Sequence, residues 1–111
     1  MPIFVTQGRY ARDALKGMLA KPEDRFEAAA KLAQAAGGKL LSYYVTFGEY
    51  DWLVVTEMPN EQQAAAFVLT AAAGGGVTDV RTMLAMTTAQ AKQAFTAAGD
   101  MTADYRPPGA A

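Results

Sequence analysis

Residues 39–58 read KLLSYYVTFGEYDWLVVTEM, and this stretch decides the fold. Two runs rich in β-branched and aromatic residues flank a single glycine, a pattern typical of a β-hairpin. We expect strands over 39–47 and 50–58, joined by a two-residue turn at Gly48-Glu49. Glycine at the first turn position suits a type II′ turn, in which that residue takes a positive φ.

This turn also predicts which residues share a face of the hairpin. Val45 pairs with Trp52, Tyr43 pairs with Val54, and side chains alternate between the faces. The largely apolar face holds Leu41, Tyr43, Val45, Phe47, Tyr50, Trp52 and Val54. The mixed face holds Ser42, Tyr44, Thr46, Asp51, Leu53, Val55 and Glu57. A three-residue loop would exchange the faces of the return strand. We favour the first register, because the second buries two carboxylates under alanine-rich helices, which is costly.

Turn and capping signals divide the rest of the chain into further elements. Gly8 ends one strand, Pro22 suits the first turn of a helix, and Gly37-Gly38 ends that helix. Asn60 with Gln63, and Thr87 with Gln90, form capping boxes. The expected elements are strand 3–7, helical piece 10–18, helix 22–36, the hairpin, helix 61–73, strand 78–86 and a helix ending near residue 98.

This order is βαββαβ with a C-terminal helix. It predicts an α+β, ferredoxin-like domain over residues 1–98, with both long helices on one face of a four-stranded antiparallel sheet. Residues 99–111 are polar and proline-containing and are expected to form a flexible tail. Gly74-Gly75-Gly76 follows a helix, the reverse of a phosphate-binding loop, and is interpreted as a linker.

The second face of the sheet is predicted to meet a partner. In the last strand, Arg81 and Met83 share one side while Thr82 and Leu84 share the other, so neither side is purely polar. An exposed apolar face of this size is unusual for a monomer. We therefore expect two sheets to pack face to face in a homodimer, or a higher homo-oligomer, and to enclose a mixed cavity.

Composition excludes several classes of function. The 111 residues carry a net charge of −1 and contain neither cysteine nor histidine. Disulfides, thiolate or histidine metal sites and thiol nucleophiles are thereby excluded, and no metal or other cofactor is expected. The absence of a basic patch argues against nucleic-acid binding. No leader or membrane-length apolar run is recognisable, so a cytoplasmic protein without a membrane partner is expected.

The stretch from Gly37 to Thr88, with GGKL before the second strand and Gly48, Tyr50 and Asp51 in the hairpin, resembles the GYD family of small bacterial proteins. The likeness extends back to the first strand at Ile3. It implies the dimeric α/β-barrel superfamily and no particular activity. A looser likeness links the hairpin to the effector-binding domains of leucine-responsive-type regulators. Cofactor-free monooxygenases and small isomerases share the superfamily, but often use histidines.

The mixed face supplies the candidate ligand-binding residues. They are Asp51, Tyr44, Thr46, Arg81, Glu57 and Gln7, whereas Gly48 and Tyr50 are assigned to the turn motif and Trp52 and Tyr43 to the core. The favoured function is a module that binds a small metabolite between two sheets of a homodimer. A small cofactor-free enzyme with Asp51 or Glu57 as base, or a purely structural oligomer, is the alternative. Asp51 has a structural alternative too, as an acceptor for loop amides.

Overall fold

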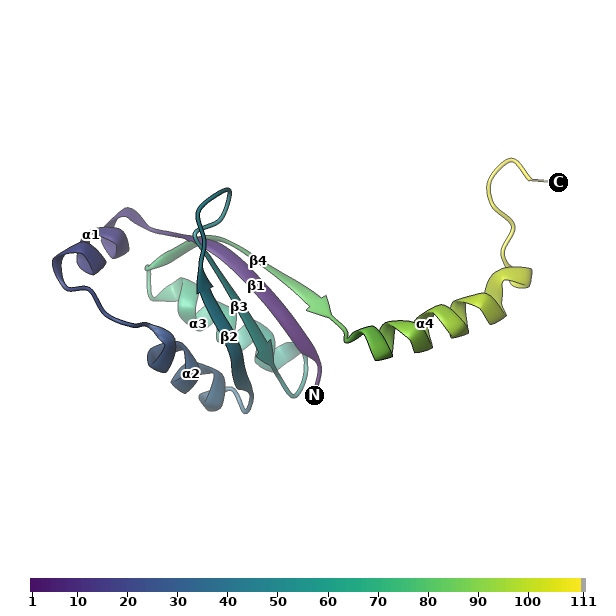
Figure 1. Cartoon of the computed structure of the whole chain (residues 1–111), viewed down its shortest axis with the longest axis horizontal. Coiled ribbons are helices and arrows are strands. Elements are labelled where there is room, and N and C mark those ends of the chain that lie inside the picture. Colours follow the sequence, from purple (N-terminus) through teal and green to yellow (C-terminus); the bar gives the residue numbers. More distant parts are fainter. Residues whose placement is uncertain (111) are drawn as a thin grey trace.

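The computed structural model describes residues 1–110 (Figure 1). The elements in chain order are β1 (Ile3–Tyr10), α1 (Arg12–Ala20), α2 (Phe26–Ala35), β2 (Lys39–Val45), β3 (Trp52–Glu57), α3 (Glu61–Ala73), β4 (Val77–Ala85), α4 (Thr88–Met101) and a 3₁₀ turn, η1 (Thr102–Asp104). The four strands form one antiparallel sheet in the order β2-β3-β1-β4. This is the predicted ferredoxin-like arrangement.

The hydrophobic core lies between one face of the sheet and helices α2 and α3. The sheet contributes alternate residues, including Phe4, Trp52 and Val54, because every second side chain of a strand points to the same face. The helices and the C-cap of α2 contribute three alanines and one phenylalanine to the core, namely Ala33, Ala36, Ala64 and Phe67. Met58, which follows β3, is completely buried. The core therefore occupies one side of the sheet only.

Helix α4 stands apart from this core. It extends away from the sheet toward the C-terminus, and the described chain is 64 Å long as a result (Figure 1). None of its residues is buried, and Phe95 is 76% exposed. The predicted Thr87–Gln90 capping box is present at its start. The helix continues to Met101, past the expected end at Ala98.

The hairpin register is confirmed. Val45 pairs with Trp52 and Tyr43 pairs with Val54, and both Trp52 and Val54 are buried against the helices. The register shifts between Leu40 and Ser42, where β2 contains a bulge. A bulge inserts one residue and reverses the alternation beyond it. Leu40 therefore enters the core, and the prediction that Leu41 would do so is wrong.

The loop between the two hairpin strands has more residues than predicted. The last backbone bond runs from the Thr46 N–H to the Asp51 carbonyl oxygen at 2.8 Å, so residues 47–50 form the loop. The Thr46 hydroxyl donates to the Tyr50 carbonyl oxygen at 2.7 Å and closes this loop. Gly48 does not have a positive φ, so the predicted type II′ turn is wrong. Phe47 is 99% exposed and does not pack under the helices.

The start of α2 also differs from the prediction. The helix begins at Phe26 rather than at Pro22. The Asp24 carboxylate accepts the Phe26 N–H at 2.9 Å, and Arg25 donates to Glu23 at 2.9 Å. A short acidic side chain that binds an amide two residues ahead favours a turn over a helix. Residues 21–25 therefore form a linker between α1 and α2.

None of the helices in residues 1–110 combines the length and the apolar character needed to cross a bilayer.

Candidate functional site

The face of the sheet opposite the core is not covered by a helix of the described chain (Figure 1). Strand pairing arranges its side chains in rows that cross the sheet. One row is Tyr44, Leu53, Gln7 and Arg81; the next is Ser42, Val55, Val5 and Met83; the last holds Lys39, Glu57, Ile3 and Ala85. We call this surface the open face. Its centre is apolar, and its polar groups lie toward the two ends.

The open face brings three of the predicted ligand-binding residues together. Gln7 pairs directly with Arg81, and Tyr44 lies two strands away in the same row. Neighbouring strands are about 4.8 Å apart, so these polar groups span roughly 15 Å. Glu57 lies four positions along β3 from Leu53, about 13 Å away at the other end of the face. Arg81 forms no ion pair with Asp51 or Glu57 within residues 1–110.

Asp51 lies one residue beyond the last pair of β1 with β3 and continues the ladder between these strands. The last strand pair is Gly8 with Trp52. One residue further, the Asp51 N–H donates to the Gly8 carbonyl oxygen at 2.8 Å. The Asp51 carboxylate then accepts the backbone N–H of Tyr10 at 2.9 Å. A side-chain oxygen thus replaces the backbone acceptor that β3 no longer supplies. Thr46 is likewise engaged within the loop, through its bond to the Tyr50 carbonyl oxygen.

Arg9 holds the same loop from β1 and is not among the residues predicted from the sequence. Its Nε donates to the Glu49 carbonyl oxygen at 2.9 Å, and its guanidinium lies 5.9 Å from the centre of the Tyr50 ring. An arginine at this distance over an aromatic face is favourable. No local pattern pointed to it, because its partners are about 40 positions away along the chain. Residues 48–51 are therefore fastened to β1 by one side chain from each segment.

A family model that matches most of the chain identifies its family. The model of the GYD domain matches residues 4–95, which run from β1 into α4. The chain belongs to the GYD domain family. The match includes Gly48, Tyr50 and Asp51 together with the β1 residues that hold them. In this GYD domain, Asp51 and Tyr50 stabilise the fold, because Asp51 binds the Tyr10 N–H of β1 and the Tyr50 ring contacts Arg9 of β1.

One solved structure supports the same fold, and two others are similar at lower scores. TTHA0845 from Thermus thermophilus is similar with a TM-score of 0.51 and 16% identity, over 78% of this chain and 95% of that one. FFRP-DM1 is similar with a TM-score of 0.49 and 21% identity, over 78% of this chain and 100% of that one. Hypothetical protein PHS023 from Pyrococcus horikoshii is similar with a TM-score of 0.48 and 21% identity, over 78% of this chain and 92% of that one. At these identities the likeness to TTHA0845 shows the fold alone. No curated protein matches the GYD chain in sequence.

The helix side of the sheet contains a cavity of about 660 Å³. Its lining includes Tyr10, Tyr43 and Trp52, and none of the six predicted ligand-binding residues. The sequence predicts that Tyr43 and Trp52 lie in the core. Trp52 is buried there and Tyr43 packs against it, but both side chains also line the cavity. The available signal was the alanine-rich faces of α2 and α3, because alanines leave space opposite large aromatic rings. Within residues 1–110, no group of three or more acidic side chains is placed to hold a metal ion.

Proposed function

We propose that this GYD domain is a homodimeric module that binds a small metabolite between two open faces. The observation that carries the proposal is the uncovered apolar centre of the open face. Val5, Val55 and Met83 form one row there, and Met83 is 53% exposed. Contiguous apolar surface of this kind is characteristic of an interaction site. A second copy has the same apolar surface, so two copies packed face to face would bury both surfaces.

Helix α4 supports a second copy in an independent way. Ala91, Ala94, Phe95 and Ala98 recur at helical spacing and form an apolar stripe, yet the sheet domain does not cover it. Isolated helices shorter than about 12–15 residues are only marginally stable in water, and α4 has 14 residues. A partner that covers this stripe would stabilise α4 in the position where it projects from the sheet.

The polar row at one end of the open face defines the chemistry of the proposed site. Arg81 supplies a positive charge, Gln7 an amide, and Tyr44 a hydroxyl. A carboxylate with an adjacent polar or aromatic group, as in an amino acid, matches these donors. Asp51 is engaged by the Tyr10 N–H and does not join this row. No comparable observation favours the enzyme alternative, since Asp51 is held as a structural acceptor.

Thermal unfolding with a panel of aliphatic amino acids tests this function. A ligand at about 100 times its dissociation constant should stabilise the folded state by about 2.7 kcal/mol. Arg81→Gln should remove the shift, whereas Lys92→Gln on α4 should retain it. If no member of the panel raises the melting temperature, or if Arg81→Gln responds like the wild type, the proposed site is wrong.

A further inference from the structure

The cavity on the helix side of the sheet is separate from the open face. It lies between the sheet, α1, α2 and α3, and its volume of about 660 Å³ falls within the range of small-molecule sites. The space is partly open to solvent, so it is a cleft that a small molecule could enter rather than a void sealed inside the core.

The cavity exists because small residues face large ones across it. Ala28 and Ala29 of α2 and Ala71 of α3 line the helix side, whereas Tyr10, Tyr43 and Trp52 line the sheet side. Small side chains on the helices cannot reach the sheet, so the aromatic rings form a floor without a matching cover. The Cβ of any larger residue at Gly8 would collide with the Trp52 indole, which shows how closely that ring is seated on β1.

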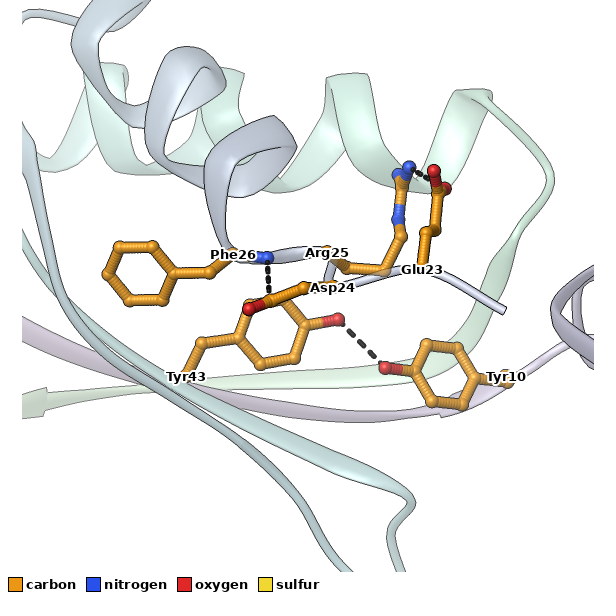
Figure 2. A network of polar contacts seen from close by, with 6 residues as sticks. All are labelled: Tyr10, Glu23, Asp24, Arg25, Phe26 and Tyr43. Carbon is orange, nitrogen blue, oxygen red and sulfur yellow. Dashed lines mark hydrogen bonds and ion pairs between the residues drawn. The ribbon is translucent and has the colours of Figure 1, made fainter. Parts of the chain in front are cut away.

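Two tyrosine hydroxyls meet at this floor (Figure 2). The Tyr10 and Tyr43 oxygens lie 2.7 Å apart, so one hydroxyl donates to the other. Burial, and then the bond to Tyr43, raise the pKa of Tyr10 well above its ordinary value. Both hydroxyls are protonated at neutral pH, as is usual for tyrosine. The pair holds two protons and uses one between its own oxygens. One O–H remains to donate to another group.

Further donors surround the tyrosine pair. Trp52 lines the cavity, and its buried indole N–H has no hydrogen-bond partner within residues 1–110. An unsatisfied buried donor is unfavourable, so an acceptor is favoured close to it. Arg25 lies in the linker above the pair, where one of its nitrogens binds Glu23 at 2.9 Å (Figure 2). A guanidinium has five N–H donors, and most remain for a second acceptor.

We propose that this cavity binds a small aromatic carboxylic acid. The carboxylate accepts from the Tyr10–Tyr43 pair and faces Arg25, and the ring packs on Trp52, Leu32 and Phe67. An apolar body with one negatively charged acceptor fits a mainly aliphatic and aromatic lining whose charged groups are the cations Lys21 and Arg25 and the single anion Glu23. The Asp51 carboxylate acts here as a positioning group, because it fixes the backbone of Tyr10.

The fluorescence of the protein reports directly on this site, since Trp52 is the single tryptophan of the chain. Phenylacetate titrated into the wild type should give a saturable change in emission. Tyr43→Phe should weaken binding about tenfold, as expected for a hydrogen bond to a charged group. Ala71→Met should block binding by filling the space while the protein remains folded by circular dichroism. Phenylacetamide, the uncharged analogue, should bind at least tenfold more weakly.

Three results would overturn the proposal. The first is the lack of any saturable change with phenylacetate. The second is equal affinity for phenylacetamide, which would show that no charge is recognised. The third involves Tyr44→Phe, a control that removes a tyrosine hydroxyl from the opposite face of β2. Weaker binding in that variant, with Tyr43→Phe unchanged, would place the acid between the open faces and support the proposed function instead.

Discussion

The Asp51 carboxylate accepts the backbone N–H of Tyr10 at 2.9 Å, although the two residues are 41 positions apart in the sequence. This bond begins where the pairing of β1 with β3 ends at Gly8 and Trp52. Because the side chain of Tyr10 points to the helix side, the bond also connects the hairpin loop with the floor of the cavity. The acidic residue of the GYD motif thus fixes β1 in place.

Replacement of Asp51 tests this structural role. Asp51→Ala leaves the Tyr10 N–H without an acceptor and should lower the free energy of unfolding by about 1.5–3 kcal/mol. Asp51→Asn retains an amide oxygen as acceptor and should cost about 1 kcal/mol or less. Urea denaturation of both variants measures the difference. Equal stability of Asp51→Ala and the wild type would show that the bond contributes nothing to the fold.

The two glycines that flank the contact between Asp51 and β1 should respond in opposite ways to alanine. A Cβ at Gly8 would lie 2.5 Å from an atom of the Trp52 ring, so Gly8→Ala should destabilise the protein by about 1–3 kcal/mol. A Cβ at Gly48 has no atom within 4 Å, and the φ of Gly48 is not positive. Gly48→Ala should therefore be neutral or stabilising by up to about 1 kcal/mol. Differential scanning calorimetry compares them, and marked destabilisation by Gly48→Ala would favour the tight turn instead.

The raised pKa of Tyr10 predicts a loss of stability at alkaline pH. The pKa is raised by burial and then by the bond to Tyr43, from an ordinary value of 10.0. Below pH 10 the tyrosine is neutral in both states, whereas above it the unfolded chain ionises first and the folded state loses stability. The loss should be less than about 1.4 kcal/mol per pH unit, because Tyr10 retains some contact with solvent.

Urea denaturation between pH 9 and pH 11 measures this loss, with Tyr10→Phe as the control. The variant has no group to ionise at this position, so its stability should fall less steeply. Parallel pH profiles for the wild type and Tyr10→Phe would show that Tyr10 ionises equally in the folded and unfolded states.

The sequence predicted the elements and the hairpin register because both follow from local patterns. Val45 and Trp52 pair as expected, since alternation of side chains and the apolar character of one face define the register. Leu41 was placed in the core instead of Leu40 because the two leucines are chemically equivalent, and the bulge between them leaves no mark in the sequence. Pro22 suits a helix start, but the Asp24 carboxylate binds the Phe26 amide and delays it.

The site was harder to predict, because its contacts join distant parts of the chain. Asp51 was identified as important, yet its partner is a backbone amide of β1, which no side-chain pattern marks. The row that joins Tyr44, Gln7 and Arg81 depends on how β1 pairs with β3 and β4, and the hairpin pattern does not predict those two registers. The cavity depends on how far α1, α2 and α3 stand from the sheet, and this distance depends on packing among many residues.

Multi-angle light scattering measures whether a second copy covers the open face. The wild type should have twice the 11.8 kDa mass of one chain. Met83→Asp places a charge at the centre of the open face and should give the single-chain mass. Leu69→Asp, on α3 at a residue that is 67% exposed, should remain dimeric. A wild-type mass of 11.8 kDa at micromolar concentration would show that the open face is not covered by a second copy.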